Sequence, residues 1–301
     1  MTFQQLTYVV EISRCGSINK AAHKLFLSQS GISSAVRELE EELGIQFFVR
    51  SNRGVEFTPE GKEFLSYAVS LLEQKQRIES LYGEGRDAAA PARFSVSTQR
   101  YPFTEDAFLR MLRTAEDNRY RYSIKETGMD AVIDDVYDHR ADVGVIFLTE
   151  LTEKMIRRLL DARGLEFHEV AAVSPCVYVR KGHPLAGRTR ISMEDLEPYP
   201  CLSFEQGQYN SFYFAEEVLS TYDYKRSIKV SDRATILNLM VGLCGYTLCS
   251  GIICEELNGS DYCAVLLEGE ETMTIGYLKR KGAALSPLGQ KYLEELEKVL
   301  V

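Results

Sequence analysis

Residues 16–44 read GSINKAAHKLFLSQSGISSAVRELEEELG, and this stretch decides the fold of the N-terminal part of the chain. Apolar residues recur at helical spacing on both sides of a short joint at Phe26-Leu27. A serine precedes each helix, Ser17 before the first and Ser28 before the second, where its hydroxyl can accept a free backbone N–H. Gly44 suits the left-handed position that ends the second helix. The stretch therefore predicts a helix-turn-helix.

The residues on either side extend this unit. Apolar residues at helical spacing over 3–12 predict a helix before the pair. After the pair, residues 45–49 and 55–57 have the composition of two short strands, and residues 50–54 that of the turn between them. We therefore expect residues 1–57 to form a winged helix-turn-helix domain of three helices and a two-stranded wing.

A longer helix is expected to begin at Pro59, with Thr58 as its cap. One row of its side chains alternates steps of four and three residues, which is typical of a helix that pairs with another helix. The row comprises Phe64, Ala68, Leu71, Lys75, Ile78 and Tyr82. We expect residues 58–90 to be a linker helix that pairs two subunits, followed by a hinge. The alternative is an ordinary amphipathic helix that lies on its own domain.

From residue 91 onwards, predicted strands alternate with helices. The strands fall at residues 94–97, 122–125, 142–147, 166–172, 176–180, 201–204, 227–230, 246–249 and 272–279, and a helix over 287–300 closes the chain. This alternation predicts an α/β domain with a largely parallel sheet. The length of residues 91–301 favours two subdomains, the first comprising about 91–165 and 268–301 and the second about 166–267.

Composition narrows the class of protein. The 301 residues are 45% hydrophobic and 26% charged, which excludes a disordered or fibrous chain. The 35 basic and 44 acidic residues give a net charge of −9, which argues against a nucleic-acid-binding surface over the whole molecule. Residues 1–62, however, contain seven of each sign. The acidic excess therefore lies outside the helix-turn-helix, where local DNA binding remains compatible with the charge.

Other patterns bear on location and cofactors. The N-terminus lacks the features of a secretory signal. Residues 234–254 carry no charge and could mimic a membrane span, but their glycines and polar residues favour a buried helix, a turn, a strand and a second helix. The seven cysteines form no CxxC pair and no zinc-ligand pattern. We expect a cytoplasmic protein without disulfides, metal, cofactor or membrane partner.

The second helix of the pair carries residue types that read DNA bases. In a helix-turn-helix this helix enters the major groove. Glutamine can hold adenine through two hydrogen bonds, arginine can hold guanine in the same way, and serine adapts to either. Two arginines flank the wing turn, where a phosphate or minor-groove contact is expected. The candidate DNA-contacting residues are Ser28, Gln29, Ser30, Ser33, Ser34, Arg37, Arg50 and Arg53. An exposed polar face is, however, also usual in any small three-helix domain.

The same region resembles the N-terminal signature of the LysR-type transcriptional regulators. The matching positions are Phe3-x-x-Leu6, Gly16-Ser17-Ile18-x-x-Ala21-Ala22-x-x-Leu25, Ser28-Gln29-Ser30-x-Ile32-Ser33, Leu39-Glu40-x-x-Leu43-Gly44, Phe47-Phe48-x-Arg50 and Thr58-Pro59-x-Gly61. Gly31 departs from the alanine common in the family, which lowers helix propensity. Weaker matches follow at Asp142-x-Gly144-Val145, Gly182-His183-Pro184-Leu185 and Val241-Gly242-x-x-Gly245.

This resemblance implies a promoter-binding regulator. It implies a homodimer through the linker helices, usually assembled as a homotetramer, and a periplasmic-binding-protein-like effector domain. A small effector in its cleft would alter DNA bending or contact spacing, which is allosteric coupling between two sites. RNA polymerase is a further expected partner.

Candidate effector-binding residues follow from the α/β pattern, because ligands bind beyond the carboxyl ends of parallel strands. They are Ser97, Thr98, Gln99, Arg100, Thr127, Gly128, Phe147, Ser203, Phe204, Glu205 and Asp232, and Arg233 lies beside Asp232 near the same strand. Tyr101, Phe147, Phe204 and Tyr209 could supply aromatic walls. Each of these side chains could instead cap a helix or fill the core. The charge of the effector stays open, since Arg100 suits an anion whereas Glu205 and Asp232 suit a cation.

Two other functions remain as alternatives. A redox-responsive regulator on the same scaffold would need a reactive thiol beside a resolving partner. Cys201 is its candidate, but no cysteine follows before Cys244. An enzyme or a solute-binding protein would use the α/β half alone. Four histidines are present, yet no GxSxG, HExxH or P-loop motif occurs, so we do not expect an enzyme.

Overall fold

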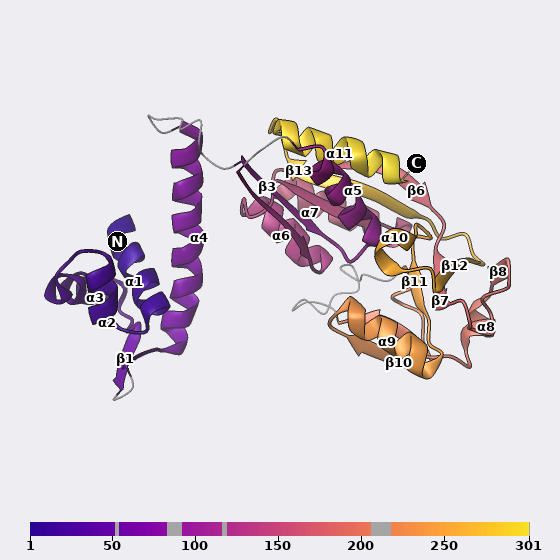
Figure 1. Ribbon diagram of the computed structural model, residues 1–301, viewed down its shortest axis with the longest axis horizontal. Helices are drawn as coiled ribbons and strands as arrows, with labels where there is room; N and C mark the ends of the chain where they lie inside the picture. Colours follow the sequence, from indigo (N-terminus) through magenta and orange to yellow (C-terminus); the bar gives the residue numbers. More distant parts are fainter. Residues whose placement is uncertain (52–53, 83–91, 116–118, 206–217, 301) are drawn as a thin grey trace. The chain divides into compact units, whose positions relative to one another are not determined.

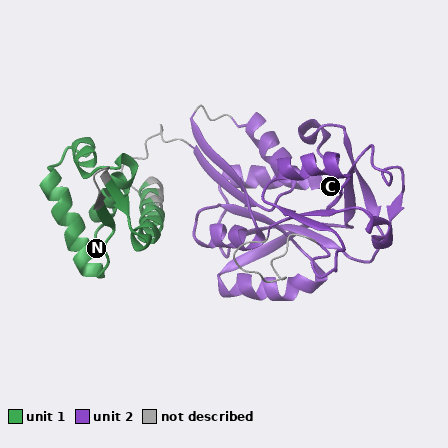
Figure 2. Cartoon of the chain, turned by 90° about the horizontal axis from the view of Figure 1, so that it is seen from below, with its two compact units in different colours: residues 1–90 green, residues 91–301 purple. Residues whose placement is uncertain are grey.

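A computed structural model describes residues 1–51, 54–82, 92–115, 119–205 and 218–300. The chain divides into two compact units, residues 1–90 and residues 91–301 (Figure 2). The hinge that we predicted before residue 91 lies outside the described residues.

The first unit contains the helix-turn-helix and its wing (Figure 1). Its elements are α1 (Phe3–Cys15), α2 (Ile18–Lys24), α3 (Gln29–Leu43), β1 (Phe48–Ser51), β2 (Gly54–Phe57) and α4 (Pro59–Tyr82). The caps form as predicted: Ser17, Ser28 and Thr58 each accept a backbone N–H three residues on. Gly44 is left-handed at φ 70°. These local hydrogen bonds hold the ends of the helices around a core that includes Val9, Ile12, Ile32, Leu39 and Phe47, all fully buried.

Helix α4 packs against its own unit along part of its length. Ala68 is buried with Leu6 and Val10 of α1, and the ring of Phe64 stacks on that of Phe47 at 4.3 Å between centroids. The prediction that the whole row from Phe64 to Tyr82 faces a second subunit is therefore wrong for Phe64 and Ala68, because α1 supplies the apolar surface that covers them.

The remaining apolar residues of α4 leave a different surface exposed. Tyr67, Leu71 and Ile78 are uncovered, and their spacing of four and seven residues places them along one side of the helix. Lys75 lies over the ring of Phe3 and pairs with Glu79. The side chain of Tyr82 is outside the described part of the chain.

The second unit begins with a five-stranded sheet ordered β4-β3-β5-β13-β6, which we call the first subdomain. Its strands are β3 (Ala92–Thr98), β4 (Tyr120–Glu126), β5 (Val143–Leu148), β6 (Leu165–Val173) and β13 (Met273–Arg280). Helices α5 (Pro102–Arg113) and α11 (Pro287–Leu300) pack on one face of the sheet around Phe94, Phe103 and Tyr292. Helices α6 (Met129–Tyr137) and α7 (Glu150–Ala162) pack on the other face around Val132, Ile156 and Leu278 (Figure 1).

The second subdomain is smaller and has two sheets, ordered β11-β7-β12-β8 and β10-β9. Its elements are β7 (Cys176–Arg180), β8 (Arg190–Ile191), α8 (Met193–Leu196), β9 (Cys201–Phe204), β10 (Ser227–Val230), α9 (Arg233–Leu243), β11 (Thr247–Cys249), α10 (Glu255–Asn258) and β12 (Tyr262–Leu267). The chain passes between the subdomains after β6 and returns after β12. No described helix is both long enough and apolar enough to span a bilayer. The uncharged stretch 234–254 forms most of α9, then β11 and the segment before α10.

Two details of the predicted α/β unit need correction. Strands β3, β4 and β5 run parallel, but β13 and β6 run antiparallel to their neighbours, so the sheet is mixed. Strand β6 pairs with β13 from Leu165 to Val173, so residues 166–173 belong to the first subdomain and not to the second. In addition, helices α7 and α8 and strands β8 and β12 were not predicted. Strand direction depends on pairing between distant segments, which composition does not reveal.

Candidate nucleic-acid interface and ligand cavity

The N-terminal turns of α3 present a polar surface to solvent. Ser28, Gln29, Ser30 and Ser34 are exposed, while Ile32 of the same helix is fully buried. Ser33 is half-buried, and its hydroxyl accepts a hydrogen bond from Gln29 Nε2 at 3.0 Å. The predicted face is therefore the exposed face of α3. Its side chains form hydrogen bonds with one another in the free protein, and hydrogen bonds to base edges could replace these.

Arg37 lies on the same helix one turn further on. Its guanidinium Nε donates to Glu41 at 2.8 Å, and the two side chains are 79% and 63% exposed. An ion pair this open contributes about 0.3–0.5 kcal/mol, so it can be exchanged for a DNA contact at small cost. The described residues of the wing include the backbone of Arg50 in β1 but not its side chain, and Arg53 lies outside them.

Phe26 in the turn between α2 and α3 was not among the predicted site residues. Its side chain is 94% exposed, and its backbone is left-handed at φ 57°. A bulky residue in that conformation is strained, by about 1–3 kcal/mol. An exposed aromatic ring beside the N-terminus of α3 can contact apolar groups of a duplex, such as a thymine methyl. The Phe26-Leu27 joint marked this position in the sequence, but its exposure required the fold.

Glu11 joins α1 to α2 next to this surface. It is almost fully buried, and it accepts a hydrogen bond from Lys24 and lies 3.8 Å from Arg14. The hydrogen bond from Lys24 lowers the pKa of Glu11, against the opposing effect of burial. Lys24 therefore holds α2 against α1, whereas the contact with Arg14 lies within α1.

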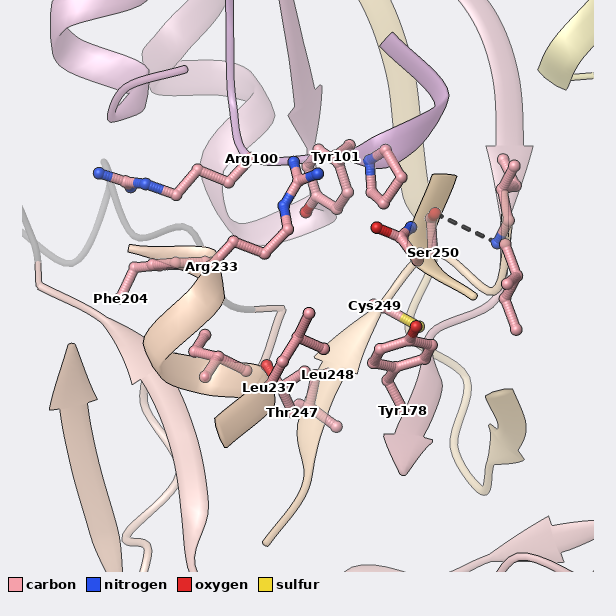
Figure 3. A pocket seen from close by; sticks show the side chains of 15 residues that line it. Arg100, Tyr101, Tyr178, Phe204, Arg233, Leu237, Thr247, Leu248, Cys249 and Ser250 are labelled. Atoms are coloured by element: carbon pink, nitrogen blue, oxygen red, sulfur yellow. Dashed lines mark hydrogen bonds between the residues drawn. The ribbon is translucent and has the colours of Figure 1, made fainter. Parts of the chain in front are cut away.

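The second candidate site is a cavity of about 80 Å³ between the two subdomains (Figure 3). Arg100, Tyr101 and Pro102, which follow β3, form its wall in the first subdomain. The second subdomain contributes Tyr178, Phe204, Arg233, Ile236, Leu237, Thr247, Leu248, Cys249, Ser250, Ile252, Ile253 and Asn258. The lining is mostly apolar, and the arginines are its charged groups. Such a mixture of apolar walls and a few polar groups is typical of small-molecule sites.

Arg233 crosses this cavity from the start of α9. Its guanidinium donates to Glu105 of α5 at 2.9 Å and also to Glu126 at the end of β4. In Figure 3 its side chain extends from α9 toward the Arg100–Tyr101 segment. Burial raises the pKa of Glu126, and the attraction of Arg233 offsets this only in part. The ion pairs of Arg233 therefore connect the two subdomains, and one of them uses Glu126, a carboxylate whose charged form is disfavoured by burial.

The uncharged polar groups of the wall stay protonated at neutral pH. Burial raises the pKa of Tyr178 to about 12 and that of Cys249 to about 12. The guanidinium of Arg100 lies 4.5 Å above the ring of Phe204, which links the subdomains a second time. The chemistry of the cavity is therefore that of an apolar surface with cationic groups at one side.

Of the eleven predicted effector-binding residues, Arg100 and Phe204 line this cavity, as does the predicted aromatic residue Tyr101. The others do not line it. Ser97 donates to buried Asp135 at 2.8 Å, which also accepts from Lys125 and Arg140. Four more of the predicted residues are buried, namely Thr98, Gln99, Phe147 and Ser203. Thr127 and Gly128 precede the first turn of α6, and Asp232 caps α9. Glu205 is exposed. Tyr209 lies outside the described residues.

The reason for these differences is the direction of each side chain. Successive side chains of a strand point to opposite faces, so a residue at a strand end reaches the cleft or the helix layer depending on register. Tyr178 and Cys249, which come from β7 and β11, were missed. Arg233, which we named beside Asp232 near the end of a strand, does line the cavity from the start of α9.

The seven cysteines are thiols, and two of them face each other across neighbouring strands. Cys201 is buried, and Cys249 lies opposite Cys176 in the register of β11 and β7, a pairing not apparent from the sequence. Burial raises the pKa of both Cys176 and Cys249, which disfavours the thiolate that oxidation requires. Within the described part of the chain, no three His, Cys, Asp or Glu side chains come together as metal ligands.

Comparison with known families matches most of the chain. The sequence model described as "Bacterial regulatory helix-turn-helix protein, lysR family" matches residues 3–62, and the one described as "LysR substrate binding domain" matches residues 114–300. The first covers α1 to the start of α4, with the polar surface of α3. The second covers most of the two-subdomain unit.

Individual proteins resemble the chain at lower identity. SsuR of Burkholderia cenocepacia, an HTH-type transcriptional regulator, is 24% identical over 68% of this chain and 65% of its own length. YbhD of Escherichia coli, also an HTH-type transcriptional regulator, is 25% identical over 94% of this chain and 87% of its own. Among solved structures, full-length CbnR in complex with its target DNA has a TM-score of 0.66 at 20% identity, over 99% of this chain and 100% of CbnR. That likeness shows a shared fold.

Proposed function

Because this chain belongs to the LysR family of bacterial transcriptional regulators, we propose that it recognises its promoter through the exposed N-terminal face of α3, aided by the wing. It is a DNA-binding transcriptional regulator with an effector-binding domain. The observation that carries the proposal is the capped α3 helix, whose apolar side is buried while Gln29, Ser34 and Arg37 face solvent. These side chains have the hydrogen-bonding groups that distinguish base pairs in the major groove.

The regulator works as a pair of subunits in this proposal. Tyr67, Leu71 and Ile78 form an apolar strip on α4 that its own unit leaves uncovered, and a second copy of the same helix would bury it. Residues 1–62 have no net positive charge, so one copy of α3 would have little general attraction for phosphates. Two copies on adjacent half-sites supply the missing affinity. Assembly of two such pairs into a tetramer, contact with RNA polymerase and residence in the cytoplasm complete the proposal.

A small molecule in the cavity between the subdomains regulates this binding. The cavity has apolar walls, two cationic side chains and ion pairs that connect its two sides, so a ligand there changes what holds the subdomains together. No metal, cofactor or catalytic step is part of this proposal. The ligand acts by binding one arrangement of the subdomains better than another.

Selection of duplexes from a random-sequence pool by the full chain tests the DNA-binding proposal. We expect an enriched motif with two half-sites separated by about 10 base pairs or a multiple, because each subunit places one α3 in the major groove. The variant Gln29→Ala should enrich a weaker or altered motif while its sedimentation coefficient stays the same. Absence of a shared motif among the sequences enriched by the wild-type chain would contradict the proposal.

A further inference from the structure

Arg233 is the residue that connects the two subdomains by charge across the cavity. It belongs to the second subdomain, and both carboxylates that it contacts, Glu105 and Glu126, belong to the first. Its side chain is only 20% exposed, so its guanidinium is largely removed from water. A buried cation needs a partner, because leaving it unpaired is strongly destabilising. Any molecule that separates Glu105 or Glu126 from Arg233 must therefore replace the lost negative charge.

The cavity next to Arg233 is suited to the remainder of such a molecule. Leu237, Leu248 and Ile236 provide apolar walls, and Tyr178 and Cys249 remain neutral. No carboxylate occurs among the described residues that line the cavity, whereas Arg100 and Arg233 both do. The lining therefore favours an anionic ligand over a cationic one.

The size of the cavity connects binding to movement. Its volume is about 80 Å³, whereas an apolar cavity that admits benzene has a volume of about 150 Å³. A ligand of more than a few heavy atoms is therefore enclosed between the subdomains only if they move apart. The ion pairs of Arg233 oppose that movement, because they join α9 to α5 and β4.

We infer that the effector is a small organic anion, a carboxylate or similar group on a short apolar body, which takes Arg233 from the glutamates of the first subdomain. This inference rests on the proposed function, since it names the ligand class of the same cavity. The planar guanidinium of Arg233 donates its hydrogen bonds to the carboxylate of the ligand in place of those of the glutamates, so the cation stays paired. The subdomains lose their connection through charge, and the apolar body of the ligand fills the widened space.

The displaced glutamate has a way to remain stable. Glu126 faces Arg233 of α9, Glu105 of α5 and Arg100 after β3. Burial already raises the pKa of Glu126, and Glu105 acts in the same direction. When Arg233 turns to the ligand, Glu126 can take up a proton and stay in place as a neutral acid. The exchange therefore leaves no unpaired buried charge.

Thermal unfolding of the full chain tests this inference with sodium butanoate and sodium hexanoate as probes. Butanamide and butylamine hydrochloride serve as neutral and cationic counterparts, and sodium chloride matches the ionic strength. The variants are Glu126→Gln, which weakens the competing partner, Arg233→Gln, which removes the cation, and Arg190→Gln, an exposed arginine of the same subdomain, as the matched control.

We expect the carboxylates to raise the unfolding midpoint of the wild type and of Arg190→Gln above the chloride value. In Glu126→Gln the same rise should need about fivefold less carboxylate, a difference of about 1 kcal/mol, because the ion pair with Glu126 no longer competes. Arg233→Gln should show no rise. If that variant fails to fold, the comparison of Glu126→Gln with the wild type still decides.

Several results would overturn the inference. One is that carboxylates act no better than chloride on both the wild type and Glu126→Gln, and another is that they act equally well on Arg233→Gln. A response to butylamine or butanamide alone would reject the anion while leaving the cavity as the effector site. The proposed function fails separately if a compound that binds in this cavity leaves the protection of a selected duplex unchanged.

Discussion

Replacing Arg37 by alanine and by lysine separates the reading of bases from the attraction of phosphates. In the free protein this arginine is 79% exposed and contacts Glu41 through an open ion pair. Its removal should therefore change the free energy of unfolding by about 0.5 kcal/mol or less. The loss of a bidentate contact to guanine is about 1–3 kcal/mol, and breaking the pair with Glu41 first reduces the net value by about 0.3–0.5 kcal/mol.

The affinity of one half-site for Arg37→Ala should accordingly fall by roughly 2- to 100-fold. The effect is squared when both subunits carry the change and both contribute independently. Arg37→Lys retains the charge but not the planar fork, so it should lose nearly as much for the selected duplex. For an unrelated duplex, the lysine variant should bind like the wild type. Glu41→Gln is the matched control, because it releases Arg37 without altering the exposed face, and it should bind equally well or slightly better.

Fluorescence anisotropy with a selected and an unrelated duplex, at several salt concentrations, measures these quantities. A phosphate contact would weaken both duplexes alike in Arg37→Ala, and lysine would restore the affinity. That pattern would refute the assignment of Arg37 to base reading. Equal affinity of all variants for the selected duplex would refute the placement of this part of α3 in the groove.

Three further predictions concern other parts of the molecule. Ser97→Ala should destabilise the full chain to urea by about 1 kcal/mol, because Asp135 loses one hydrogen bond, while the effector response stays intact; a lost response with unchanged stability would contradict this. Burial alone would raise the pKa of Asp135, but its hydrogen bonds lower the pKa below the ordinary value. The contribution of Asp135 to stability is therefore present above about pH 4 and declines as the pH falls further. Urea titrations of the wild type and of Ser97→Ala at several pH values across that range measure this decline. Ile78→Glu should shift sedimentation toward the monomer, because it places a charge in the exposed apolar strip of α4, whereas Glu63→Gln on the same helix should not. An unchanged dimer would show that the subunits pair through another surface. Phe26→Gly should stabilise the first unit by up to about 1 kcal/mol through relief of the left-handed strain, yet lower duplex affinity, and equal affinity would exclude Phe26 as a DNA contact.

Local signals were sufficient for the helices of the DNA-binding unit, whereas the first wing strand, expected at residues 45–49, lies at Phe48–Ser51. The caps at Ser17, Ser28 and Thr58 use hydrogen bonds that span three residues, and the left-handed Gly44 is a property of one residue. Such features are legible in the sequence because the atoms involved are close in the chain. Burial of Ile32 beneath exposed Gln29 follows from helical period alone.

Longer contacts were less accessible. The apolar residues from Phe64 to Tyr82 were correctly placed on one helix. Helix α1 covers Ala68 but leaves Ile78 exposed, and this difference depends on how α1 crosses α4. Strand β6 has an ordinary strand composition, and only its pairing with β13 assigns it to the first subdomain. The amino-acid pattern of a strand does not specify its neighbour, because each edge of a strand can pair with many partners.

The amino-acid sequence by itself determined the helix-turn-helix, the polar face of α3, the linker helix and the α/β character of the rest, since periodicity, capping and turn chemistry act over a few residues. The tertiary structure decided which of the candidate residues line the cavity between the subdomains. Arg233 meets Glu105 and Glu126 across 128 and 107 residues of chain, and Ser97 turns toward Asp135 and away from the cavity. Those outcomes depend on strand order, register and the packing of two subdomains, which arise only when distant segments bury their apolar surfaces together.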